Sequence, residues 1–146
     1  MEQQAAAAVL DAPGNAERVD VTPLAGESYE AVVRGHRIVV DQPAEAGGHD
    51  RAPTPVELFV TSLATCVAYY AGRYLTRHGY SRDGLAVSAG FTMAGDRPAR
   101  VSDIRLTVRV PAGLPAGRRP ALLAVASHCT VHNTLVSAPS VTIDLD

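Results

Sequence analysis

Large apolar and aromatic side chains recur every three or four residues between residues 52 and 80. They are Phe59, Leu63, Val67, Tyr70 and Tyr74. That spacing places them on one face of an α-helix, and the residues between them are mostly small. Thr-Pro-Val-Glu at residues 54–57 forms a capping box with proline at the first helical position, and Gly79 suits a left-handed helix end. The pattern therefore predicts one long, largely apolar helix.

Three short segments before this helix alternate apolar and polar residues, as half-buried strands do. They are residues 19–24, 29–34 and 38–41. Their connections have hairpin length, which predicts an antiparallel meander. Residues 42–51 read QPAEAGGHDR, and their glycines, proline and charges predict a mobile loop leading into the helix.

The chain after the helix repeats the alternation. Residues 85–92 and 101–110 predict a second hairpin, residues 120–127 and 127–135 two short helices, and residues 141–145 a final strand. This order predicts an α+β protein whose antiparallel sheets wrap the long central helix. Because a helix so apolar needs cover on most sides, we expect a homodimer whose sheets enclose both central helices.

Length and charge narrow the class of protein. The 146 residues show no break in composition, so we expect one domain over residues 18–146 after a flexible tail at residues 1–17. The net charge is −2 and the arginines are scattered, which argues against a nucleic-acid partner. The chain has no stretch resembling a membrane span or a secretory signal. We therefore expect a cytoplasmic protein with no membrane partner.

The chain has two cysteines, too few for the disulfide framework of a small secreted protein. Cys66 lies within the predicted long helix, and Cys129 lies near the second short helix. Their positions in the sequence allow several interpretations of their role. Most unpaired cysteines are inert buried side chains. A zinc site with His128 and His132 is weaker, because the spacing matches no recognised zinc motif, and acyl transfer lacks an evident orienting acid. We expect no metal and no cofactor.

Three features together resemble the OsmC/Ohr family of thiol-dependent peroxidases: PTPVELF at residues 53–59, a cysteine on the central helix, and HCTVHNTL at residues 128–135. The resemblance extends from Arg18 onward and includes the order of strands and helices. It implies an OsmC-like fold, an intertwined homodimer, and a bacterial antioxidant role in stress response. It also implies reduction of organic hydroperoxides, in which Cys66 becomes a sulfenic acid and then a disulfide with Cys129. A dithiol reductant restores both thiols.

The resemblance further implies an arginine that favours the thiolate of the peroxide-attacking cysteine, steered by a glutamate at the start of the central helix. The corresponding early loop, residues 24–28, contains no arginine. We take Arg37 as the candidate, with Arg34 and Arg51 as alternatives. The glutamate is Glu57, one residue later than in the family, where it also completes the capping box. The predicted catalytic set is Cys66, Cys129, Glu57 and Arg37.

A different function is compatible with the same chain. An OsmC-like module without turnover could bind a small apolar ligand at the dimer interface, in a pocket lined by Phe59, Tyr69, Tyr70 and the apolar strands. Such a module would tolerate serine at either cysteine, whereas the peroxidase needs both thiols.

Overall fold

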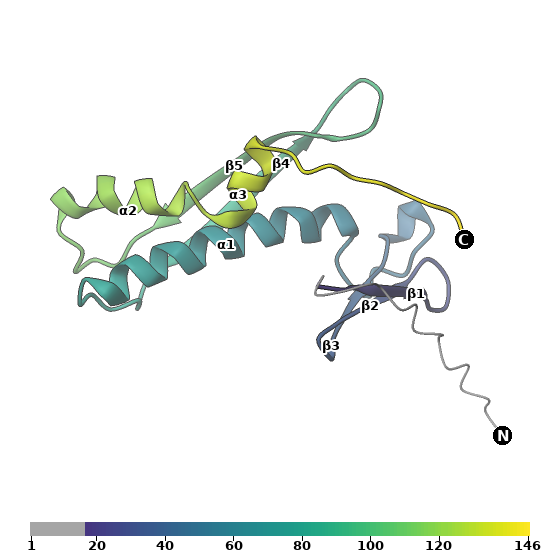
Figure 1. The fold of residues 1–146 in the computed structure, drawn as a ribbon, viewed down its shortest axis with the longest axis horizontal. Coiled ribbons are helices and arrows are strands. Elements are labelled where there is room, and N and C mark those ends of the chain that lie inside the picture. The colour runs from purple at the N-terminus through teal and green to yellow at the C-terminus, as the bar shows by residue number, and fades with distance from the viewer. Residues whose placement is uncertain (1–16) are drawn as a thin grey trace. The chain divides into compact units, whose positions relative to one another are not determined.

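The computed structural model describes residues 17–146, so the predicted flexible tail lies outside the described residues except for Glu17. The described chain divides into two compact units, one ending at Glu57 and the other beginning at Leu58. Each unit has its own antiparallel sheet (Figure 1). Among the described residues, no helix combines the length and hydrophobicity that crossing a bilayer requires.

The sheet of the first unit is the predicted meander. Strands β1 (Asp20–Pro23), β2 (Tyr29–Val33) and β3 (His36–Val40) pair in that order, each antiparallel to its neighbour. The turn between β2 and β3 places Arg34 and Gly35 at positive φ, 48° and 80°. Only glycine adopts that backbone freely, so Gly35 permits the tight reversal.

A buried carboxylate organises the loop that follows β3. Asp41 is fully buried and accepts the backbone N–H groups of Gln42 at 2.8 Å, His49 at 3.2 Å and Arg51 at 3.1 Å. These bonds, first of all the one from Arg51, lower the pKa of Asp41. A Cβ atom at Gly48 would lie 1.9 Å from the carbonyl oxygen of Gln42, so the loop also needs glycine there. The loop contains one 3₁₀ turn, η1 (Ala44–Ala46).

The long helix α1 (Pro55–Arg77) begins and ends where the sequence predicts. Glu57 accepts the backbone N–H of Thr54 at 2.7 Å, and the Thr54 hydroxyl accepts that of Glu57 at 3.2 Å, which confirms the capping box. At the other end Gly79 has φ 76°, and the N–H of Tyr80 donates to the carbonyl of Leu75 at 2.9 Å. This bond closes the helix in a Schellman arrangement.

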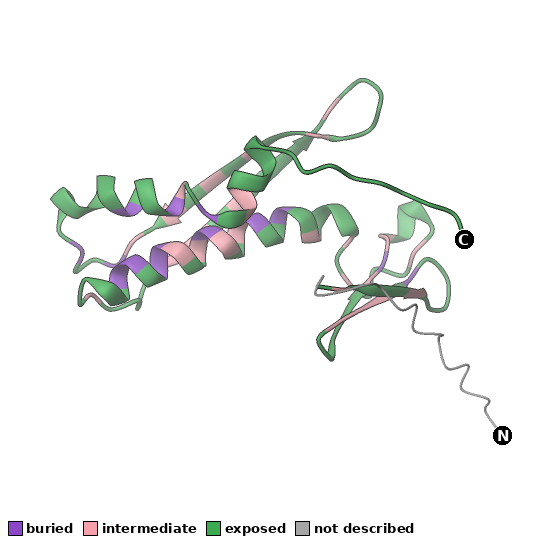
Figure 2. Ribbon diagram, viewed as in Figure 1, coloured by how far each residue is buried: buried purple, intermediate pink, exposed green. Residues whose placement is uncertain are grey.

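The buried side of α1 differs from the predicted side at its start. Figure 2 shows buried and half-buried positions recurring along α1. Leu63, Val67 and Tyr74 are buried as expected, but the buried side begins at Val60, whereas Phe59 is 39% exposed. Tyr70 is half-buried. Two adjacent apolar residues satisfy the same helical period, so periodicity alone could not choose between Phe59 and Val60.

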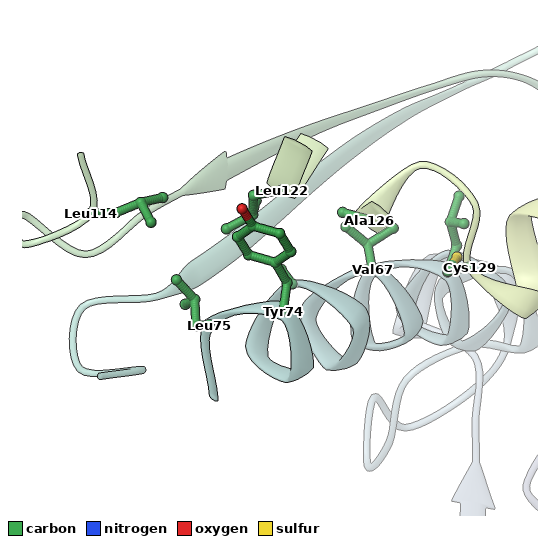
Figure 3. Packing of buried hydrophobic residues seen from close by; sticks show 9 residues of the cluster. Val67, Tyr74, Leu75, Leu114, Leu122, Ala126 and Cys129 are labelled. Atoms are coloured by element: carbon green, nitrogen blue, oxygen red, sulfur yellow. The ribbon is translucent and has the colours of Figure 1, made fainter. Parts of the chain in front are cut away.

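The second unit adds a long hairpin and two short helices to α1. Strands β4 (Ala86–Met93) and β5 (Val101–Arg109) pair antiparallel, and the 3₁₀ turn η2 (Ala116–Arg118) leads into α2 (Arg119–Ala126) and α3 (Thr130–Val136). The core consists of side chains from α1, α2 and the segments flanking α2 (Figure 3). They are Leu63, Val67, Ala71, Tyr74, Leu75, Leu114, Leu122, Ala126 and Cys129. Apolar side chains of β4 and β5 pack against this cluster.

The predicted final strand is not formed. Residues 138–146 have no regular secondary structure, and Val141, Ile143 and Leu145 are 76%, 90% and 101% exposed. An alternating segment becomes a strand only when a neighbouring strand accepts its hydrogen bonds. Neither sheet of the described chain pairs with it. The remaining elements give the predicted α+β class, with antiparallel sheets and one long helix.

Candidate functional site

The fold brings together two cysteines that are far apart in the sequence. Cys129 is fully buried in the core of the second unit, and Cys66, half-buried on α1, packs against that core. Figure 3 shows Cys129 over α1, in the same cluster as Val67 and Ala126. The two thiols are free and near enough for Cys66 to influence the ionisation of Cys129. Two redox-capable side chains therefore share one site.

The surroundings of Cys129 favour its thiol form. Burial is the main cause that raises the pKa of Cys129, and the neighbouring Cys66 thiol acts in the same direction. The Cys129 sulfur also accepts the backbone N–H of His132 at 3.4 Å, so the side chain is the N-cap of α3. At neutral pH this cysteine is a protonated, enclosed thiol.

The turn between α2 and α3 is fixed by local hydrogen bonds. The His132 ring Nδ1 bonds the carbonyl of Ser127, and the Asn133 side-chain amide donates to the carbonyl of His128 at 3.2 Å. The His128 ring bonds the carbonyl of Ala124 at 2.7 Å. Each of the two histidines considered as zinc ligands, His128 and His132, therefore has one ring nitrogen engaged in a hydrogen bond to a backbone carbonyl. Within residues 17–146, no cluster of three or more His, Cys, Asp or Glu side chains could hold a metal ion.

One hydrogen bond joins the neighbours of the two cysteines. The hydroxyl groups of Tyr70 on α1 and Thr130 at the start of α3 lie 2.9 Å apart. Tyr70 follows Cys66 by one helical turn, and Thr130 follows Cys129 directly. Sequence reasoning missed this contact, because it depends on the packing of two helices that are 60 residues apart.

The other two predicted site residues make contacts of their own in the first unit. The Glu57 carboxylate is the capping acceptor of Thr54. Nine residues separate Glu57 from Cys66, about 13 Å along a helix axis, so the two side chains of one chain do not meet. Arg37 forms a two-pronged ion pair with Glu30, with Nε–Oε1 at 2.8 Å and Nη2–Oε2 at 2.6 Å. Its guanidinium is therefore held in a defined orientation.

Two apolar cavities of the second unit are lined by neighbours of the two cysteines, although neither cysteine lines them. The first has a volume of about 200 Å³ and is lined by residues of α1, β5, α2, the α2–α3 turn and α3. They are Leu63, Val67, Leu106, Val108, Leu123, Ala126, Ser127 and His132. The second, of about 350 Å³, shares Leu63 and His132 with the first and is also lined by Phe59 and Leu135. The three aromatic residues expected in one binding pocket line three different cavities: Phe59 lines the second of these two, and Tyr69 and Tyr70 each line a separate one.

The arrangement has counterparts among known proteins. The family model described as OsmC-like protein matches residues 48–144. No curated protein matches the chain. A crystal structure of a protein from Psychrobacter arcticus, provisionally named an osmotic stress induced and detoxification response protein, superposes with a TM-score of 0.75 at 24% identity and covers 86% of this chain and 91% of its own.

Two further crystal structures share the fold at lower identity. An organic hydroperoxide resistance protein OsmC from Legionella pneumophila has a TM-score of 0.59 at 16% identity, with 84% of this chain and 91% of that chain covered. A protein from Vibrio cholerae, provisionally named for organic hydroperoxide resistance, carries captopril in one of its active sites; its TM-score is 0.63 at 18% identity, with 88% and 90% covered. Since the family model spans most of the chain and the fold agrees, this chain belongs to the OsmC-like protein family.

Proposed function

We propose that residues 18–146 form an OsmC-like domain acting as a thiol-dependent peroxidase on organic hydroperoxides. The observation that carries the proposal is the pair of free thiols, Cys66 and Cys129, gathered at one site from positions 63 residues apart. Cysteine pairs of this kind, formed by distant segments of an intracellular chain, are more often catalytic than structural. The family includes proteins named for organic hydroperoxide resistance, which is consistent with this chemistry.

The unequal burial of the two thiols assigns their roles in the proposal. Cys66 is only partly buried, whereas Cys129 is fully enclosed and its raised pKa keeps it protonated. A peroxide from solvent reaches the less buried thiol first, and the enclosed thiol then reacts with the product formed beside it. Cys66 is therefore the peroxide-attacking residue and Cys129 the resolving residue.

The reaction proceeds in three balanced steps. The Cys66 thiolate attacks the terminal peroxide oxygen, so an S–O bond forms, the O–O bond breaks and Cys66 becomes a sulfenic acid. The alkoxide takes a proton from water, which balances the proton lost when the thiolate formed, and leaves as an alcohol. The sulfur of Cys129 then attacks the Cys66 sulfenic acid, which forms the disulfide and releases water. A dithiol reductant transfers two electrons and two protons to restore both thiols. A cytoplasmic location fits this cycle, because a reducing compartment supplies the dithiol.

The apolar cavities support an organic rather than an inorganic peroxide. Leu63 and Val67, which line the first cavity, lie one turn before Cys66 and directly after it on α1. His132, which lines both cavities, donates its backbone N–H to Cys129. An alkyl or aryl group placed there would leave water, while its peroxide end stays near the thiols.

The proposal gives Arg37 the task of favouring the Cys66 thiolate. Glu30 holds the Arg37 guanidinium by two hydrogen bonds, so in this chain Glu30 performs the steering that the family resemblance gives to the helix-opening glutamate. Glu57 keeps its place in the proposed site as the residue that fixes the start of α1. An oriented guanidinium stabilises a nearby thiolate by charge and by hydrogen bonding.

We further propose that the protein acts as a homodimer. Many large apolar side chains of the described chain are exposed, among them Phe59 at 39%, Tyr69 at 60%, Leu123 at 58% and Val136 at 74%. Apolar surface on this scale is typical of an interface between chains. Sedimentation of the purified protein distinguishes a dimer from a monomer by mass, and a monomer at micromolar concentration would contradict this part of the proposal.

A module that binds an apolar ligand without turnover is the second candidate. The cavities of about 200 and 350 Å³ favour it, because each could hold a small apolar molecule. The two functions differ in their need for sulfur: binding survives serine at both cysteines, whereas peroxide reduction does not.

Replacement of each cysteine by serine tests the proposed function. The Cys129→Ser protein should react with an alkyl hydroperoxide and accumulate a sulfenic acid at Cys66, which dimedone traps for mass spectrometry. The Cys66→Ser protein should show neither a sulfenic acid nor peroxide consumption. An active Cys66→Ser protein would rule out the proposed chemistry, whereas a wild-type protein that consumed no peroxide would leave the ligand-binding function.

A further inference from the structure

The position of Tyr70 on α1 brings its side chain over Cys66. The two residues are one turn apart on the same face, and long side chains of a helix lean back toward its N-terminus. The ring of Tyr69 contacts the Tyr70 ring edge-on, with centroids 5.6 Å apart at 83°. This contact restricts the tyrosine ring and so fixes where its hydroxyl group lies.

Thr130 belongs to a rigid segment that also carries Cys129. Two hydrogen bonds tie α3 to the α2–α3 turn: the His132 ring bonds the Ser127 carbonyl, and the Asn133 side chain donates to the His128 carbonyl. Thr130 is the first residue of α3, and the Cys129 sulfur caps the same helix. A contact that fixes the position of Thr130 therefore also fixes the position of the Cys129 thiol.

The bond between the Tyr70 and Thr130 hydroxyl groups is the link between these two rigid parts. Among the hydrogen bonds formed within residues 17–146, it alone connects α1 to α3. Apart from the two thiols themselves, the side chains of these segments that pack in the core are mostly apolar, and apolar contact is non-directional. A hydrogen bond has a preferred length and angle, so it sets the register of α3 against α1.

We propose that Tyr70 and Thr130 are positioning residues that hold the Cys129 thiol in place to form a disulfide with Cys66. The inference rests on the proposed function for its role in turnover, but the disulfide itself can be measured without peroxide. In the reduced protein the hydroxyl pair keeps the thiols adjacent. Without it, the reduced protein also adopts arrangements in which they are apart. The disulfide keeps the two segments together in any case, so loss of the bond favours the reduced form.

The test is the equilibrium of the cysteine pair with dithiothreitol. Oxidised dithiothreitol takes two electrons and two protons from the protein dithiol and leaves the Cys66–Cys129 disulfide. The Tyr70→Phe protein should show an equilibrium constant for disulfide formation that is about two- to tenfold smaller, the factor that one net hydrogen bond supplies. A tenfold change corresponds to a rise in reduction potential of about 30 mV.

Matched variants separate positioning from general stability. Thr130→Val should have the same effect as Tyr70→Phe, Thr130→Ser should restore the wild-type constant, and the double variant should be no worse than either single one. Tyr69→Phe is the control, since it removes the same atom from an adjacent, 60% exposed tyrosine. Thermal unfolding of each reduced protein reports whether it is folded.

The outcomes are decisive. A Tyr70→Phe protein with the wild-type equilibrium constant, or equal effects of Tyr69→Phe and Tyr70→Phe, would overturn the proposal. A wild-type protein that formed no intramolecular disulfide with oxidised dithiothreitol would also overturn the proposal. In that last case the dimedone-trapped sulfenic acid at Cys66 would still decide the peroxidase chemistry, so failure of the positioning role is distinguishable from failure of the proposed function.

Discussion

The sulfur of Cys129 accepts a hydrogen bond from the backbone N–H of His132 at 3.4 Å, so the proposed resolving cysteine is also the N-cap of α3. A residue with both roles links redox chemistry to the order of a short helix. Serine is a good N-cap and alanine is a poor one. The two substitutions should therefore differ in their effect on stability although both remove the thiol.

We predict that Cys129→Ala lowers the free energy of unfolding by about 0.5–2 kcal/mol, because α3 loses its cap. Cys129→Ser should cost less, since its hydroxyl group accepts the same N–H. Urea unfolding of the reduced proteins measures both values. Equal destabilisation by serine and alanine would show that the cap contributes nothing.

The two thiols should differ in reactivity toward an alkylating agent. Only the thiolate reacts, and burial raises the pKa of Cys129 and encloses its sulfur. Iodoacetamide at pH 7 should label Cys66 first, and labelling of Cys129 should require a higher pH or unfolding. Mass spectrometry of peptides at short times gives the order. Labelling of Cys129 before Cys66 would reverse the proposed roles.

Arg37 should be required for the fast reaction of Cys66. We predict that Arg37→Met slows formation of the sulfenic acid roughly tenfold or more at neutral pH, the usual effect of losing a cation beside an acidic group. The rate is measured by stopped flow with the Cys129→Ser protein. Arg18→Met is the matched control, because Arg18 also pairs with an acid in the first unit, Asp20, with Nη2–Oδ1 at 2.7 Å.

The alternatives to Arg37 are tested by the same assay. If Arg34→Met or Arg51→Met slowed the reaction and Arg37→Met did not, the assignment of Arg37 would be wrong. The bond between Asp41 and the backbone of Arg51 positions that arginine on the loop after β3, so Arg51 is the first alternative to examine.

Asp41 should make the stability of the protein depend on pH in the acid range. Its pKa in the folded protein is lowered, chiefly by the Arg51 N–H, so the folded state binds the proton less tightly than the unfolded state. This contribution is complete above the unfolded carboxyl pKa of about 4 and is lost as the pH falls through the lower folded value.

We therefore predict that the melting temperature falls between pH 5 and pH 2, and that Asp41→Asn is less stable than wild type at pH 7 but loses less on acidification. The asparagine keeps one acceptor oxygen for three N–H groups. Thermal unfolding at a series of pH values measures both proteins. Parallel curves for the two would show that Asp41 does not contribute to the acid transition.

Local signals in the sequence were sufficient to predict most elements. Thr54 and Glu57 determine where α1 begins, and Gly79 determines where it ends. Such caps can be predicted from sequence because they involve residues only a few positions apart. The strand–helix order followed from periodicity. These features need no knowledge of what lies across the fold.

Features that depend on distant neighbours were missed or wrong. The strand at residues 141–145 lacks a pairing strand within the described chain, and no local pattern reveals that. The hydrogen bonds from backbone N–H groups to the Asp41 carboxylate depend on a loop that returns to this side chain within ten residues. The Tyr70–Thr130 bond depends on how α1 and α3 pack. The pairing of Cys66 with Cys129 was expected only from the family resemblance. Their proximity depends on the same packing of distant segments.

The most direct test of the central claim is mass spectrometry of the reduced protein after one equivalent of an alkyl hydroperoxide. The account predicts that within seconds the protein loses two hydrogens and that a disulfide joins Cys66 to Cys129, with one alcohol released for each disulfide formed. If both thiols remained reduced while the peroxide persisted, the peroxidase function would be contradicted.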